Sequence, residues 1–152
     1  KAIPNAQVDF IEIDTIHHAT IQKNAERNGI DDNRYRIFTG DLFVTEPPLD
    51  ATYDFILTNP PYIDSEAHTV EDSVVAHEPH LALFGGTKGF ELIEKIISEA
   101  RDYLSPLGVL YIEHEEEQTS LILKLATPLG YIVHTYKDQY GVLRYSRLSR
   151  VT

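Results

Sequence analysis

Three residue types are missing from this 152-residue sequence, which contains no cysteine, no methionine and no tryptophan. Without cysteine, neither a disulfide framework nor a thiolate metal site can form. Long apolar runs are also absent, so no stretch has the length of a membrane span, and no charged-then-apolar leader opens the chain. Because the sequence opens on Lys1 rather than on methionine, we expect it to be part of a longer protein.

Basic residues are scarce. The chain has 13 Lys and Arg against 24 Asp and Glu, a formal net charge of −11 and a pI near 4.9. Such a surface is poorly suited to hold a phosphate backbone, so nucleic acid is not the expected partner and a basic protein fits better. The length and the 42% hydrophobic content predict one globular domain with a sizeable core.

The most informative stretch runs from Tyr53 to Tyr62. Its first part, Tyr53 to Leu57, is a short apolar and β-favouring run that predicts a buried strand. The strand is followed by Asn59 and two prolines, which cannot continue a ladder. We therefore expect a rigid loop at the carboxyl end of a strand, where ligands bind in open α/β sheets.

The residue types of this loop suit methyl transfer to an amide or exocyclic amino nitrogen. Such a nitrogen is a poor nucleophile because its lone pair is delocalised, so it must be turned until that lone pair faces the electrophile. The Asn59 side-chain oxygen and the Pro60 carbonyl can each accept one N–H, Pro61 helps to fix the backbone, and Tyr62 offers a ring face to the planar group. The proton can leave after the nitrogen has become cationic, so no general base of unusual pKa is required. The alternative is an ordinary turn, for which Asn and Pro are also common.

An upstream strand, Val8 to Asp14, ends in an acid. At the end of the second strand of a nucleotide-binding sheet, Asp14 is well placed to accept hydrogen bonds from ribose hydroxyls. Glu12, two residues earlier in the strand, is the competing candidate for this role. The alternative for Asp14 is an ordinary solvent-facing acid beside a helix cap. Thr15 is the expected cap of the following helix, which Gly29 should end.

A further strand, Tyr35 to Phe38, leads into Gly40-Asp41-Leu42. At the same sheet edge, Asp41 could accept a hydrogen bond from an adenine amino group while Leu42 covers the base. A simple turn is the alternative for this Gly-Asp pair.

The second half alternates between helix and strand. The pattern predicts a helix from about Phe90 to Leu104, a strand from Val109 to Ile112, a helix around Leu121 to Leu125, and an antiparallel hairpin of Tyr131 to Tyr136 and Leu143 to Leu148. The acidic run at 113–117 is expected to be a solvated corner between strand and helix. The whole pattern indicates an α/β fold.

Three segments after Tyr62 carry weaker signals. Ile63 to Val74 is polar and reads as a surface loop near the site or as a plain connector. His77-Glu78-Pro79-His80 has two histidines without a further ligand set, so no metal is expected there. Gly85-Gly86-Thr87-Lys88-Gly89 lacks the spacing of a phosphate loop and predicts a turn into a helix.

These elements resemble the later part of a class I S-adenosylmethionine-dependent methyltransferase (Rossmann-like) sheet with its carboxyl-terminal hairpin. More specifically, the chain resembles the HemK/PrmC family of release factor glutamine methyltransferases. The segments that carry the resemblance are Glu12-Ile13-Asp14 with Asn24-Ala25, Gly40-Asp41-Leu42-Phe43, Asn59-Pro60-Pro61-Tyr62-Ile63, Glu78-Pro79 through Leu81-Ala82-Leu83 to Gly85-Gly86, Ile112-Glu113-His114 with Gln118, and Lys137-Asp138 to Arg147.

The resemblance implies methyl transfer from S-adenosylmethionine to the glutamine of the Gly-Gly-Gln motif of a class I peptide chain release factor. It implies that Asn59 and Pro60 orient the amide, that Pro61 shapes the loop and that Tyr62 packs against the amide. The residues that it implies for cofactor binding are Asp14, Asp41, Leu42 and Asn59. A monomer acting in the bacterial cytoplasm, or in mitochondria, is expected. The family's first strand with its glycine-rich loop, and its amino-terminal helical domain, would lie before Lys1, so residues 1–152 would be the carboxyl-terminal part of a single catalytic domain.

Two other functions are compatible with the same motif. One is an amino methyltransferase of adenine in DNA or RNA, or of a glutamine in a ribosomal protein. The acidic balance and the lack of a basic and aromatic recognition segment speak against nucleic acid. The other, from a different class, is a non-catalytic binding module that retains the fold.

Overall fold

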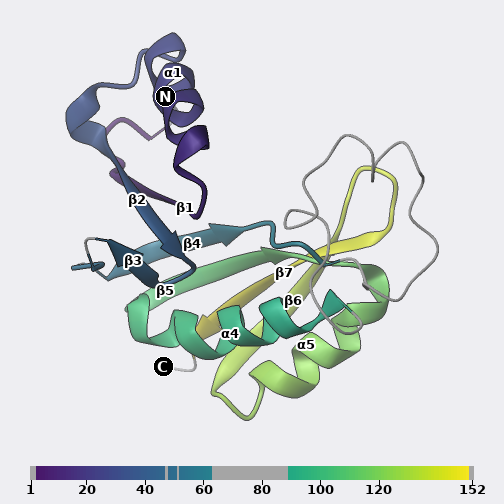
Figure 1. Ribbon diagram of the computed structural model, residues 1–152. Helices are drawn as coiled ribbons and strands as arrows, with labels where there is room; N and C mark the ends of the chain where they lie inside the picture. Colours follow the sequence, from purple (N-terminus) through teal and green to yellow (C-terminus); the bar gives the residue numbers. More distant parts are fainter. Residues whose placement is uncertain (1–2, 47, 51, 63–88, 151–152) are drawn as a thin grey trace. The chain divides into compact units, whose positions relative to one another are not determined.

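The computed structural model describes residues 3–46, 48–50, 52–62 and 89–150. They form two compact units, residues 1–51 and residues 52–152, which are described separately below (Figure 1). We refer to them as the first and the second unit.

The first unit is a three-stranded sheet with one crossover helix. Its elements are β1 (Val8–Glu12), a 3-10 turn (Thr15–His17), α1 (His18–Arg27), a second 3-10 turn (Asp32–Arg34), β2 (Tyr35–Asp41) and β3 (Val44–Glu46). The strand order is β1-β2-β3, with β2 parallel to β1 and antiparallel to β3. The helix ends as expected at Gly29, whose φ of 64° is a conformation that glycine adopts without strain.

The second unit is a four-stranded mixed sheet with two helices. Its elements are β4 (Tyr53–Thr58), α4 (Glu91–Tyr103), β5 (Leu104–Glu113), a 3-10 turn (Glu116–Gln118), α5 (Thr119–Ala126), β6 (Tyr131–Lys137) and β7 (Leu143–Arg150). The strand order is β4-β5-β7-β6, in which β4 and β5 are parallel and the other pairs antiparallel. The predicted carboxyl-terminal hairpin is thus confirmed.

The core of the second unit lies between this sheet and its two helices, which Figure 1 shows side by side against the strands. One face of α4 carries Ile93, Ile96, Ile97 and Ala100 at helical spacing, and all four are buried. From the sheet, Leu110, Ile112 and Leu148 are fully buried. This packing fixes the position of β5, beside which the candidate loop lies.

The start of β5 differs from the prediction. The strand was predicted to begin at Val109, but β5 already begins at Leu104. A register shift between Tyr53 and Phe55 accommodates the extra residues of β5. Glycine is required at 108 because a Cβ there would lie 2.6 Å from the carbonyl oxygen of Tyr53.

Strands β1 and β4 each lie at an edge of their own sheet. Both carry exposed apolar side chains: Val8, Phe10 and Ile11 on β1, and Phe55 and Leu57 on β4, where Leu57 is 73% exposed. Strands of this composition are typical of a sheet interior. No helix among the described residues is long and apolar enough to cross a membrane.

Candidate active site

The loop Asn59-Pro60-Pro61-Tyr62 follows β4 directly, as the sequence predicts. The strand ends at Thr58, Asn59 is exposed, Pro60 is buried, and Pro61 and Tyr62 are half-buried. Thr58 pairs with Ile112 of β5, so Asn59 and Glu113 follow at the carboxyl ends of two neighbouring parallel strands. The candidate loop therefore stands where ligands bind in α/β sheets.

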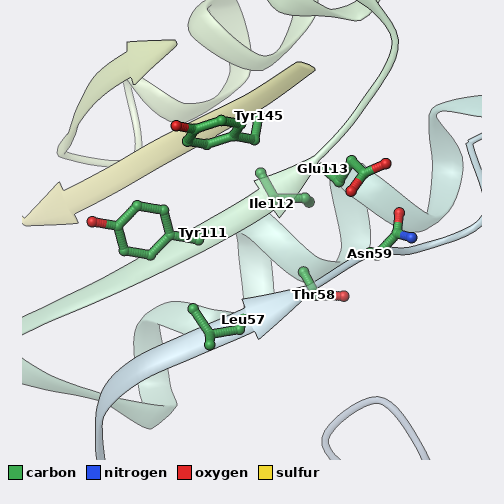
Figure 2. Close-up of a pocket in the computed structure, with 7 residues that line it drawn as sticks. All are labelled: Leu57, Thr58, Asn59, Tyr111, Ile112, Glu113 and Tyr145. Carbon is green, nitrogen blue, oxygen red and sulfur yellow. The ribbon is translucent and has the colours of Figure 1, made fainter. Parts of the chain in front are cut away.

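An open hollow of about 360 Å³ lies at this edge of the second unit (Figure 2). It is lined by Leu57, Thr58, Asn59, Tyr111, Ile112, Glu113 and Tyr145. Its size falls in the lower part of the range of small-molecule sites. Apolar and aromatic side chains make up most of the lining, and the polar groups of Asn59 and Glu113 lie together at one end (Figure 2). A planar amide group would find both a flat apolar surface and hydrogen-bond acceptors here.

The carboxamide of Asn59 makes no hydrogen bond to any other residue that the structure describes. Its oxygen is therefore available to accept an N–H from a substrate. Because Pro60 is buried and both prolines have a fixed φ, the backbone that carries Asn59 is held in place before any ligand binds. An exposed amide on a rigid backbone is suited to orient a second amide.

The Tyr62 phenol donates a hydrogen bond to Glu113 Oε1 at 3.2 Å. Burial, followed by the nearby charge of Glu113, raises the pKa of Tyr62 above its ordinary value of 10.0. The phenol is consequently protonated at neutral pH and acts here as a donor rather than as a base. Contact of its ring with a substrate amide stays a prediction.

The acidic corner after β5 was expected to be solvated, and this expectation was wrong for His114. This side chain is fully buried. Its Nδ1 lies 2.7 Å from the carbonyl oxygen of Glu115 and its Nε2 lies 2.8 Å from Ser146 Oγ, which in turn lies 2.8 Å from Thr135 Oγ1. Since a carbonyl can only accept, Nδ1 carries the proton and Nε2 accepts from Ser146.

Lowering the pH is expected to destabilise the protein through His114. Burial lowers the pKa of His114 below its ordinary value of 6.5, and the nearby Arg144 acts in the same direction, against Glu113 and Glu115. As the pH falls, the imidazole therefore takes up a proton in the unfolded chain before it does so in the folded protein. The stabilisation is complete above pH 6.5 and is lost as the pH falls through the folded-state pKa.

Urea unfolding at about pH 7.5 and about pH 5.5 measures this effect before most carboxylates titrate. The replacement His114→Gln should be less stable at both pH values, with a smaller pH-dependent difference. An unchanged difference would contradict the assignment to His114.

In the first unit, Asp14 caps the 3-10 turn that precedes α1. Its Oδ1 accepts a hydrogen bond from the backbone N–H of Ile16 at 3.0 Å, so the cap is Asp14 and not Thr15 as predicted. The backbone N–H of Asp14 in turn donates to Glu12 Oε1 at 2.9 Å. Asp14 is exposed, and its second carboxylate oxygen has no partner within the described part of the chain. The capping role therefore leaves one acceptor for a ligand.

Asp41 ends β2, the parallel neighbour of β1. Glu12 pairs with Thr39, so Asp14 and Asp41 follow their strands at the same edge of the sheet. Leu42 begins the two-residue turn into β3 with a φ of 54°, which is rare for a leucine; backbone conformations of this kind cluster at functional sites. Gly40 is required because a Cβ there would lie 2.3 Å from the carbonyl oxygen of Val44.

The hydrogen-bond acceptors at this edge fit the nucleoside part of S-adenosylmethionine. Two carboxylates can accept hydrogen bonds from hydroxyl and amino groups, and the half-buried Leu42 offers an apolar surface beside them. The structure thus brings Asp14, Asp41 and Leu42 to one edge of the first unit, and Asn59 to Tyr62 to one edge of the second.

For two residues of the site, the sequence analysis predicted no chemical role. Glu113 lines the hollow, and the side chain of Gln118 binds the backbone of Tyr62. A capping-box spacing, Glu115-x-x-Gln118, was the available signal for Gln118, and both partners of that box are formed. The segment Ile63 to Val74, the His77 to His80 pair, the Glu78-Pro79 match and Gly85 to Lys88 lie outside the described residues.

Comparisons with known proteins agree with this fold. The methyltransferase small domain family matches residues 1–86. A release factor glutamine methyltransferase from Geobacter sulfurreducens is 35% identical over 95% of this chain and 50% of its own length. A ribosomal protein uL3 glutamine methyltransferase from Burkholderia pseudomallei is 33% identical over 79% of this chain and 40% of its own length. The chain thus spans about half the length, or somewhat less, of these relatives.

Solved structures give the same fold. A methyltransferase from Pyrococcus furiosus has a TM-score of 0.67 and 23% identity, covering 96% of this chain and 63% of that one. A structure from Streptococcus mutans in complex with SAH has a TM-score of 0.56 and 11% identity, covering 95% of this chain and 76% of that one. The predicted α/β class and the predicted resemblance of this chain to glutamine methyltransferases are thereby confirmed.

Proposed function

Because the chain belongs to the methyltransferase small domain family, we propose that its protein methylates the side-chain amide nitrogen of a glutamine. The observation that carries the proposal is Asn59, an exposed carboxamide on a proline-fixed loop at the rim of a hollow. Among the described residues nothing bonds this amide, so its oxygen can accept an N–H from a substrate. Relatives that act on glutamine in a release factor or in ribosomal protein uL3 support an amide as the acceptor.

In this proposal, the chain's own residues turn and hold the acceptor nitrogen. The methyl donor of this family, S-adenosylmethionine, supplies an electrophilic methyl group. The Asn59 oxygen and the Pro60 carbonyl each accept one N–H of the glutamine amide, so that its lone pair faces that methyl group in line with the breaking bond. Methyl transfer would form one C–N bond and break one S–C bond, whose electron pair would stay on the sulfur of the departing thioether, and the nitrogen would then lose one proton to solvent. The buried Pro60 keeps both acceptors in register throughout.

For the cofactor, we propose that Asp14 accepts from the ribose hydroxyls, that Asp41 accepts from the adenine amino group, and that Leu42 covers the base. Asn59 would contact the cofactor as well as the amide. The positions of Asp14 and Asp41 at the carboxyl ends of adjacent parallel strands support these roles. Glu12 has one oxygen bonded to the backbone N–H of Asp14, just as Asp14 has one bonded to the backbone N–H of Ile16, so Glu12 stays the competing candidate.

For the substrate, we propose the glutamine of the Gly-Gly-Gln motif of a class I peptide chain release factor in the bacterial cytoplasm. The Geobacter sulfurreducens relative, which matches 95% of this chain, supports this choice. A glutamine of ribosomal protein uL3 is the second candidate, because relatives named for that substrate are similarly close. The net charge of −11 favours either of these proteins over DNA or RNA.

We also propose that the chain is the carboxyl-terminal part of a single catalytic domain. The exposed apolar side chains on the edge strands β1 and β4 support a further strand as their partner. Experiments on activity therefore use the full-length protein.

Incubation with S-adenosylmethionine and purified release factor, followed by mass spectrometry of the Gly-Gly-Gln peptide, tests the function. We expect a gain of one methyl group on the glutamine. Transfer to uL3 instead would select the second substrate. Transfer to neither protein, with cofactor binding demonstrated by calorimetry, would contradict glutamine methylation.

A further inference from the structure

The two prolines fix the shape of the Asn59 to Tyr62 loop, and the buried Pro60 holds its start. The far end of the loop is held by bonds from Tyr62 to other elements. Its phenol donates to Glu113 at the end of β5. Its backbone carbonyl accepts a hydrogen bond from Nε2 of Gln118 at 3.1 Å. The backbone bond is the more informative one, because it acts on the loop itself.

Within the described part of the chain, the Gln118 carboxamide joins three backbone segments. Its Nε2 also donates to the carbonyl oxygen of Gly89, just before α4, at 3.0 Å. Its Oε1 accepts from the backbone N–H of Glu115 at 3.0 Å. The side chain is buried, with only 5% of the residue exposed. Only one orientation of the amide gives this pattern, since both carbonyls require a donor and the N–H requires an acceptor.

We propose that Gln118 is a positioning residue for methyl transfer, which deepens and rests on the proposed function. By holding the peptide group after Tyr62, it sets the place of the Pro60 carbonyl two residues upstream. The intervening prolines have few backbone torsions to absorb a displacement, so a shift at Tyr62 reaches the acceptor groups. A misplacement of about 1 Å at a reacting centre can cost roughly 100-fold in rate. Gln118 itself touches neither substrate nor cofactor in this scheme.

Two replacements of Gln118 test the role. The replacement Gln118→Met keeps the volume but removes every hydrogen bond, and Gln118→Glu keeps the acceptor for Glu115 but loses both donors. We expect kcat per bound cofactor to fall about 10-fold to 100-fold in both variants. The KM for the protein substrate and the calorimetric stoichiometry of cofactor binding should stay within about two-fold of wild type, because neither depends on the fine position of the amide acceptors.

The matched control is Ile122→Val in α5, a fully buried residue whose change lowers stability without touching the loop. Turnover is divided by the amount of bound cofactor. A loss of folded protein would lower total turnover and bound cofactor together and leave their ratio unchanged, whereas a positioning role lowers the ratio. If both Gln118 variants kept the wild-type turnover per bound cofactor, the positioning role would be wrong. The proposed function would not be affected by that result. If the wild-type protein transferred no methyl group to a release factor or uL3 glutamine, the proposed function would fall, and this role with it.

Discussion

Replacing Asn59 with alanine is expected to lower kcat by about 100-fold or more, while the Kd for S-adenosylmethionine changes by less than about three-fold. The carboxamide is exposed and unbonded within the described part of the chain, so its removal leaves no broken internal contact. What is lost is one of the two acceptors that turn the glutamine nitrogen toward the methyl group. The loss should therefore appear in the transition state rather than in cofactor binding.

Single-turnover methylation of the substrate peptide and calorimetric titration of the cofactor measure the two quantities. Asn33→Ala is the matched control, because Asn33 is also an exposed asparagine but lies in the 3-10 turn Asp32–Arg34, at the opposite end of β2 from Asp41. Its kcat should equal that of wild type. If Asn59→Ala lost turnover and cofactor affinity in equal measure, its contact with the cofactor would account for the whole effect, and the proposed orientation of the amide would be wrong.

The sequence predicted the parts of this site that depend on neighbouring residues. The strand before Asn59 is recognisable from its apolar, β-favouring run. Its predicted end at Leu57 lies one residue before the observed end at Thr58. The hairpin of β6 and β7 is equally local, since two alternating runs flank a turn at 138–141. In both cases the signal and the structure lie in the same short stretch of chain.

What the sequence could not predict depends on contacts between distant residues. Gln118 binds the backbone of Tyr62, 56 residues away, and His114 binds Ser146, 32 residues away. Their charged and polar surroundings in the sequence indicated a solvated corner, whereas tertiary packing buries both side chains. Strand β3 was missed for a different reason. Its turn, Leu42-Phe43, contains neither glycine nor asparagine, although Leu42 adopts a positive φ.

The replacement Asp14→Ser is expected to raise the Kd for S-adenosylmethionine by about ten-fold or more without a loss of stability. A serine hydroxyl can still cap the turn before α1 by accepting from Ile16, so the local fold is preserved. It has no second oxygen, however, and the proposed bonds to the ribose hydroxyls are lost. Hydrogen bonds to a charged group contribute roughly 1.5–3 kcal/mol each, which corresponds to at least a ten-fold change in affinity.

Two further variants make the result specific to one carboxylate oxygen. The replacement Asp14→Ala removes both roles, so it should lose the same affinity and also about 0.5–2 kcal/mol of stability. The replacement Glu12→Gln keeps an oxygen for the Asp14 N–H and should leave the Kd unchanged. Calorimetry on the full-length proteins, with thermal unfolding alongside, measures both effects. The opposite pattern, in which Glu12→Gln loses affinity and Asp14→Ser keeps it, would assign the ribose to Glu12 and leave Asp14 as a helix cap only.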